Sequence, residues 1–290
     1  MEFLKKYEVH ALFCALLLGC IFVWTTVYAQ EQGRGVLTFA MLDIGQGDAL
    51  FIEGPTGLQM LIDAGPNTGA VLSALARVMP LGDRTLDAVI ETHPDADHMG
   101  GFIDVLDRYQ VGSYISPDIS KTNTVIEAVK KELAQQDIPV YTARRGMVID
   151  LGGGAELDIL YPDMDVSGYG EKTNDGSIVA RLVYGETEVL LTGDAAFDTE
   201  NHLLAVASTS LASDLLKVGH HGSKTSTGSA FIEAIHPELA LISVGAKNSY
   251  GHPTKEALER LRAAGVPVMR TDVQGTIVCR SDGRQFACGL

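Results

Sequence analysis

From Val36 onward, hydrophobic and polar positions follow the periods of strands and helices, and this pattern predicts a folded domain. Short apolar runs between turn residues predict strands at 36–43, 48–53, 58–63, 86–90, 147–151, 156–161, 177–184, 188–191, 215–218, 239–244 and 266–269. Apolar positions three or four residues apart predict helices at 67–79, 101–109, 122–136, 197–207, 229–235 and 254–264. Mostly antiparallel strands interrupted by helices favour an α+β fold, a four-layer αββα sandwich of two stacked sheets covered by helices.

The N-terminal segment has a different pattern and is predicted to lie outside that domain. Residues 11–29 are almost unbroken in apolar character, which is long enough for a transmembrane helix across about 30 Å of hydrocarbon. Lys5 and Lys6 precede this segment, so residues 1–10 are expected in the cytoplasm and the remaining chain outside. The alternative is a secretory signal peptide cleaved near Ala29, but the apolar run exceeds the usual core of about 7 to 15 residues. We therefore predict a membrane anchor, a linker at 30–35 and one domain at 36–290.

Charge limits the kinds of surface that this domain offers. Lys and Arg total 22 against 37 Asp and Glu, a formal net charge of -15. Such a balance argues against a surface built for broad adhesion to nucleic acid or anionic lipid. A polyanionic substrate would have to be attracted locally, by metal ions and a few cationic side chains.

Cys279 and Cys288 flank a hairpin signal at 281–284. An oxidising compartment would permit a disulfide between them. Pairing about Asp282-Gly283 does not set the two cysteines directly opposite, so the sequence leaves the bridge open.

Metal-binding side chains are crowded into His93-Pro94-Asp95-Ala96-Asp97-His98-Met99-Gly100-Gly101, directly after the strand predicted at 86–90. Two carboxylates and two imidazoles this close together repel or desolvate one another unless a divalent cation compensates them. Imidazole and carboxylate ligands suit zinc, manganese or iron. The alternative is a polar loop whose charges face water. The spacing HxDxDH followed by two glycines favours the metal site.

Three further segments carry polar side chains just past a predicted strand. They supply Asp194, the pair His220 and His221, and His252. Each alone also fits an ordinary role, such as a helix N-cap, a packed histidine or a turn residue. Together they are expected to meet at one rim of the fold, because ligands at like ends of several strands converge.

These motifs resemble the metallo-β-lactamase-fold hydrolases. In fuller form they resemble the extracytoplasmic hydrolase domain of the ComEC family of competence DNA-uptake proteins, through 43–48, 92–101, 191–194, 216–223 and 250–253. The resemblance covers about Val36 to Ile277 and does not include that family's membrane channel. It implies two divalent cations, Zn²⁺ or Mn²⁺, with ligands His93 and Asp95 at the first, Asp97, His98 and His220 at the second, and Asp194 bridging both.

Two departures from the family pattern concern the first cation. Asp95 stands where a histidine is usual, and no histidine lies between His98 and His202. The first position is therefore expected to bind its cation more weakly, or to be vacant in some conditions. Its ligands are also harder in character, which suits Mn²⁺ better. The remaining candidates are residues that support the ligands or contact substrate, namely Asp63, Asp48, Asn174, Ser177, His221 and Ser223.

The implied function is a metal-dependent hydrolase, with a phosphodiesterase or nuclease acting on extracytoplasmic DNA as the leading hypothesis. Water ionised by the metal would be the nucleophile, and Asp97, Lys224 and His252 are the candidates for a direct part in catalysis. Nucleic acid, the membrane and a DNA-uptake machinery are the implied partners. The alternatives are hydrolysis of another ester, such as a phosphocholine ester or a lactone, and a non-catalytic DNA-docking module that contains metal. The sequence does not indicate an oligomeric state.

Overall fold

The structure is a computed structural model that describes residues 10–21 and 35–289. The chain divides into two compact units between Gly35 and Val36. In the first unit, residues 10–21 are helical. Residues 22–29 of the expected membrane span and 30–34 of the expected linker lie outside the described residues. Over the described ranges, no helix has both the length and the apolar character needed to cross a bilayer.

The second unit contains two large sheets. The first sheet has the strand order β17 (Phe286–Gly289), β16 (Ile277–Ser281), β1 (Leu37–Met41), β2 (Leu50–Glu53), β3 (Gln59–Ile62), β5 (Ala88–Ile90), β7 (Tyr114–Ser116), β8 (Val140–Thr142). The strands from β17 to β3 pair antiparallel, and those from β3 to β8 pair parallel. A small parallel pair lies beside it, formed by β4 (Thr85–Leu86) and β6 (Gln110–Val111).

The second sheet has the strand order β15 (Val268–Arg270), β14 (Leu239–Ile242), β13 (Leu215–Lys217), β12 (Thr187–Leu191), β11 (Val179–Tyr184), β10 (Ala155–Tyr161), β9 (Val148–Gly152). Its strands from β12 to β15 pair parallel and those from β9 to β12 antiparallel. The sequence predicted mostly antiparallel strands, but three of the seven strand pairs described in the first sheet and three of the six in the second are parallel. Helices return the chain between the parallel strands and make that pairing possible.

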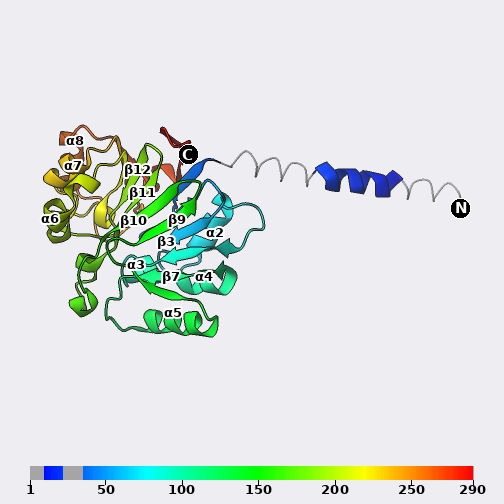
Figure 1. Cartoon of the computed structure of the whole chain (residues 1–290), viewed down its shortest axis with the longest axis horizontal. Coiled ribbons are helices and arrows are strands. Elements are labelled where there is room, and N and C mark those ends of the chain that lie inside the picture. The colour runs from blue at the N-terminus through cyan, green and yellow to red at the C-terminus, as the bar shows by residue number, and fades with distance from the viewer. Residues whose placement is uncertain (1–9, 22–34, 290) are drawn as a thin grey trace, which may run out of the picture. The chain divides into compact units, whose positions relative to one another are not determined.

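Alternation along the strands builds the layers. Phe39 and Ile52 point into a core shared by both sheets, while Ala40 and Phe51 on the same strands pack toward helices. The helices on that outer face are α2 (Ala70–Val78), α4 (Phe102–Arg108) and α5 (Thr124–Gln135). The second sheet is covered by α6 (Phe197–Val206), α7 (Ser229–Ile235) and α8 (Lys255–Ala263), as Figure 1 shows. The expected four layers are therefore present.

Short elements complete the unit and hold the loops near the strand ends. They are α3 (Ala96–Met99), α9 (Thr271–Gln274), η1 (Ser167–Tyr169), η2 (Thr173–Gly176), η3 (Ser208–Ser210) and η4 (Gly219–Gly222). Asn123 begins α5 by accepting the N–H groups of Val125 and Ile126. Thr254 begins α8 by accepting the N–H of Ala257.

The C-terminal hairpin corrects the register expected from the sequence. Ser281 pairs with Phe286, so four residues form the turn instead of Asp282-Gly283 alone. This shift places Cys279 directly opposite Cys288, with their Cα atoms 4.0 Å apart, and the two form a disulfide.

Candidate metal centre

The candidate ligands follow strands whose carboxyl ends meet between the two sheets. Asp63 follows β3, and His93 follows the parallel neighbour β5. On the second sheet, Asp194 follows β12, and His221 follows its parallel neighbour β13. The first sheet therefore supplies one half of the cluster and the second sheet supplies the other.

The two glycines after His98 allow the metal loop to pack closely. A Cβ on Gly101 would lie 2.0 Å from the Ala64 carbonyl oxygen. A Cβ on Gly100 would lie 2.7 Å from the Asn67 nitrogen. Any larger residue would push α3 away from the end of β3. The Gly-Gly pair thus keeps His98 against Asp63.

Three buried imidazoles bring their Nε2 atoms to within 4.0 Å of one oxygen of Asp194, and the partly exposed His220 lies 3.8 Å from the same oxygen. His98 Nε2 lies 3.3 Å from Asp194 Oδ2, His221 Nε2 lies 3.6 Å from it and His93 Nε2 lies 4.0 Å from it. Asp97 Oδ2 is 3.4 Å from His221 Nε2. His93, His98, His221 and Asp194 are buried. The donor atoms of His93, His98 and Asp194 all lie within 4.8 Å of one another. The same holds for those of Asp97, His98 and His221.

The other nitrogen of each imidazole has a partner that fixes the ring. His98 Nδ1 donates to Asp63 at 2.8 Å, and His221 Nδ1 donates to the Ser243 carbonyl at 3.0 Å. His93 Nδ1 donates to the Thr92 hydroxyl at 3.1 Å. With Nδ1 as the donor, each Nε2, once it has lost its proton, can offer its lone pair to a cation beside the shared carboxylate.

These Nε2 atoms fit a cation. Among buried polar atoms, His93 Nε2, His98 Nε2, His221 Nε2 and Asp194 Oδ1 have no hydrogen-bond partner. Buried polar atoms without partners are costly, and imidazole with carboxylate is a common donor set for divalent metals. The residues present therefore match the cation that the sequence predicts.

Electrostatics shows that protons compete for the same position. Burial opposes charge on His98 and His221, but nearby carboxylates, above all Asp194, more than offset it. The pKa of His98 is raised well above its usual range, and that of His221 is raised to about 10. Burial and the neighbouring His98 lower the pKa of His93 to about 4. A divalent cation must displace these protons to bind.

His221, and not His220, sits with the second group of donors. The sequence assigned His220 to that place and His221 to a supporting role. Both residues adopt left-handed backbone angles, with φ of 48° and 53°, which turn the two rings in different directions. The His220 side chain is 27% exposed, with Nε2 3.8 Å from Asp194 and Nδ1 3.4 Å from Asn174 Nδ2. In this geometry His221 is grouped with Asp97 and His98, while His220 remains a candidate ligand near Asp194.

Asp48 and Lys217 form a buried pair beneath the centre. Lys217 Nζ lies 2.7 Å from Asp48 Oδ2 and also donates to the Gly193 carbonyl at 2.8 Å. Asp48 Oδ1 in turn lies 3.4 Å from His221 Nδ1. Asp48 was a candidate from the sequence and Lys217 was not. A lysine inside an apolar strand next to the histidines could have indicated a buried charged partner.

The remaining predicted residues have different places. Ser177 Oγ accepts the N–H of Asp194 at 3.3 Å and so holds the shared ligand. Ser223 bonds Thr225 within its own loop, and Lys224 is exposed. Burial, His220 and His221 lower the pKa of His252, whose buried Nδ1 has no hydrogen-bond partner.

Asp95 is turned partly away from the cluster. Its Oδ2 lies 3.7 Å from His93 Nε2, but its Oδ1 accepts hydrogen bonds from Lys121 and Thr173. Neither Lys121 nor Thr173 was a candidate from the sequence.

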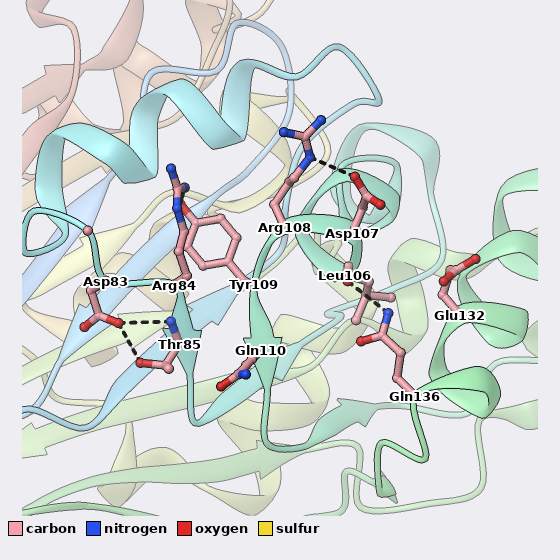
Figure 2. A pocket seen from close by; sticks show the side chains of 11 residues that line it. Asp83, Arg84, Thr85, Leu106, Asp107, Arg108, Tyr109, Gln110, Glu132 and Gln136 are labelled. Carbon is pink, nitrogen blue, oxygen red and sulfur yellow. Dashed lines mark hydrogen bonds and ion pairs between the residues drawn. The ribbon is translucent and has the colours of Figure 1, made fainter.

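A cavity of about 680 Å³ lies at the other ends of the parallel strands. Figure 2 shows an ion pair between Arg108 and Asp107 and a hydrogen bond from Thr85 to Asp83 along its wall. Arg84 lies over the ring of Tyr109 and bonds its hydroxyl. This cavity is distinct from the metal centre.

Comparison with known proteins defines the class. The sequence profile of the Metallo-beta-lactamase superfamily matches residues 42–246, and the chain belongs to that superfamily. The fold of YhfI from Bacillus subtilis is similar, with a TM-score of 0.57 at 15% identity over 84% of this chain and all of that one. A diiron β-hydroxylase, CmlA of Streptomyces venezuelae, has a TM-score of 0.54 at 13% identity, covering 84% of this chain and 54% of that one. Both show the fold alone.

Sequence relatives include a protein named as a competence protein. The chain is 31% identical to ComE operon protein 3 of Bacillus subtilis, over 93% of this chain and 36% of that protein. It is 29% identical to competence protein ComA of Neisseria gonorrhoeae (91% and 35%), and 30% identical to recombination protein 2 of Haemophilus influenzae (94% and 32%). The chain thus spans about a third of these relatives. The expected resemblance is confirmed, and superfamily and donor cluster together support a metal-dependent hydrolase.

Proposed function

We propose that this chain is a phosphodiesterase that hydrolyses nucleic acid outside the cytoplasm, using two divalent cations, Zn²⁺ or Mn²⁺. The observation that carries the proposal is the set of buried Nε2 atoms, on His93, His98 and His221, which face Asp194 without hydrogen-bond partners. A relative named as a competence protein and another named as a recombination protein support nucleic acid as the substrate.

The donors divide into two cation positions. Asp97, His98 and His221 would hold one cation, His93 and Asp95 the other, and Asp194 would contact both. Bound divalent cations lower the pKa of water and stabilise charge on phosphoryl oxygens, so no nucleophilic side chain is required. Asp63 and Ser243 keep the Nε2 lone pairs of His98 and His221 directed at the centre.

His252 is proposed to contact the substrate. Its ring centre lies 5.5 Å from that of His220 and 6.5 Å from that of His221. Because burial and these neighbours lower its pKa, the imidazole is neutral at pH 7. A neutral ring serves as a hydrogen-bond donor to a phosphoryl oxygen, in preference to giving up a proton.

An exposed aromatic ring beside His252 supports a substrate that contains bases. Tyr250 is 66% exposed and stacks on His252, with ring centres 5.9 Å apart and planes inclined by 22°. Asn248 fixes this loop by accepting the N–H groups of Tyr250 and His252. Stacking of a base on an aromatic side chain contributes about 1–3 kcal/mol and tolerates any sequence.

The location is proposed to be extracytoplasmic, with a membrane anchor at 11–29. The Cys279–Cys288 disulfide supports an oxidising compartment. Exposed Lys224 in the loop after His221 supplies a local cation on an otherwise acidic chain.

The test uses the full chain in detergent, stripped of metal and reloaded with Mn²⁺ or Zn²⁺, with end-labelled single-stranded DNA as substrate. We expect metal-dependent cleavage that Asp97→Ala reduces by at least about 100-fold. The matched control is Asp107→Ala on α4, whose side chain is 71% exposed. Hydrolysis of phosphocholine esters or lactones without DNA cleavage would refute the nuclease proposal. Absence of turnover on any ester would favour a docking module.

A further inference from the structure

The carboxylate of Asp95 is held by two groups outside the metal motif. Its Oδ1 accepts a hydrogen bond from Lys121 Nζ at 2.9 Å and another from the Thr173 hydroxyl at 2.8 Å. Its Oδ2 lies 3.7 Å from His93 Nε2. In the described part of the chain, His93 shares a group of metal donors with His98 and Asp194 but not with Asp95. The donor atoms of that group all lie within 4.8 Å of one another.

We propose that Lys121 holds Asp95 away from the cation position beside His93 and supplies positive charge there. The centre then binds one cation tightly, at Asp97, His98, His221 and Asp194, and a second one only weakly. This inference rests on the proposed function for the presence of a metal centre, and it adds Lys121 as the residue that makes the two positions unequal.

Two segments outside the metal motif each contribute one hydrogen-bond donor to Asp95. Lys121 lies between β7 and α5, and Thr173 begins η2. The side chains of Lys121 and Asp95 are 19% and 29% exposed, and Thr173 is buried. A partly buried ammonium on a carboxylate makes a stronger hydrogen bond than a neutral donor, and the second bond from Thr173 fixes the orientation. Glu171 also lies 3.5 Å from Lys121, but it is 90% exposed and contributes little.

Formal charge supports one tight cation. Among the carboxylates of the cluster, Asp48 is paired with Lys217, and Asp63 is bound by His98 and Thr92. The other three, Asp95, Asp97 and Asp194, total −3 when ionised. One divalent cation together with the Lys121 ammonium totals +3 and balances these three. A second divalent cation would enter with no further carboxylate oxygen directed at it and beside an ammonium, which repels it. Removing the ammonium both frees Asp95 and removes that repulsion.

The experiment measures binding of Mn²⁺ to the metal-stripped full chain by calorimetry and by equilibrium dialysis with metal analysis, without substrate. Wild type is expected to bind one equivalent tightly and a second at least about tenfold more weakly. Lys121→Met should strengthen the second binding step by at least about tenfold. Lys121→Arg, which keeps the charge, should behave as wild type.

Lys130→Met serves as the control, because Lys130 lies on α5 with a side chain 63% exposed and should leave both steps unchanged. The inference is overturned if wild type binds two equivalents with equal affinity, or if Lys121→Met leaves or weakens the second step while circular dichroism shows a folded protein. A chain that binds no Mn²⁺ or Zn²⁺ would refute the proposed function as well. Absence of DNA cleavage with the expected binding would refute only the proposed function.

Discussion

Two adjacent histidines at the end of β13 differ in what they can bind. His221 is buried, with Nδ1 committed to Ser243 and Nε2 free toward Asp97 and Asp194. His220 is partly exposed and lies nearer to Asn174 and His252. This difference depends on two successive left-handed residues, and no pattern of residue types reveals which ring such a turn directs inward.

The different roles of the two histidines can be tested with paired substitutions. His221→Ala is expected to weaken the tight Mn²⁺ or Zn²⁺ site by at least about 100-fold, because it removes a direct donor. His220→Ala should weaken it by less than about tenfold. Calorimetric titration of both variants gives the two values. Equal losses, or a larger loss for His220→Ala, would restore the original assignment.

Sequence reasoning found the ligands that are close together in the chain. His93, Asp97 and His98 fall within six positions after one strand, so their convergence needed no knowledge of tertiary structure. Lys121 and Thr173 could not be found in this way. They reach Asp95 from loops 26 and 78 residues away, and neither stands in a recognisable motif.

At the level of elements, α6 and the loop after His221 are joined by one buried carboxylate. Glu200 on α6 accepts the N–H groups of Thr227 and Gly228. Burial raises the pKa of Glu200 to about 7, although both N–H groups favour the charged form. This contact fixes the loop that carries Ser223 and Lys224 at the rim of the metal centre.

The raised pKa predicts a pH-dependent stability. Between about pH 4.5 and 7 the folded state binds more protons at Glu200 than the unfolded state, so the free energy of unfolding falls as pH rises through this window. The loss is on the order of 3 kcal/mol. Glu200→Gln should abolish this contribution, so the variant gains stability relative to wild type from pH 5 to pH 8. Urea unfolding with EDTA measures it.

Glu259→Gln on α8 is the control for that comparison, because Glu259 has a side chain 53% exposed. The difference in free energy of unfolding between Glu259→Gln and wild type should be the same at pH 5 and at pH 8. A constant difference for Glu200→Gln as well would show that Glu200 does not titrate in this range.

Most elements followed from the hydrophobic pattern, including the three-residue β13, but some short strands did not. The strand β1 of the first sheet and the strands β10 and β12 of the second carry largely buried apolar runs. The pattern predicted the bounds of each strand to within a few residues. The sequence missed β7 and β8. Each has three residues, and β8 is an exposed edge strand without an apolar side, so neither has a period to detect.

At the scale of the molecule, the C-terminal hairpin is fastened to the first sheet through β16, which pairs with β1. The disulfide joins residues nine positions apart. Closing a loop of that length lowers the entropy of the unfolded chain enough to stabilise the fold by about 2.5 kcal/mol.

Reduction of this bond is therefore expected to lower the free energy of unfolding by about 2.5 kcal/mol. Urea unfolding with and without reductant measures the change, and the variant with both Cys279→Ser and Cys288→Ser should not respond to reductant. Counting thiols in the denatured protein should find Cys14 and Cys20 free. Four free thiols in the isolated chain would contradict both the bridge and the support that it gives to an oxidising compartment.

The division of the donors between the sheets has a consequence for the domain as a whole. His93, Asp97 and His98 belong to one sheet, and Asp194 and His221 belong to the other. A cation bound at this centre would take its ligands from both halves of the sandwich, so its affinity would depend on how firmly the two sheets pack together. A substitution in the core shared by the two sheets, far from any ligand, should therefore weaken metal binding before it unfolds the helices and strands.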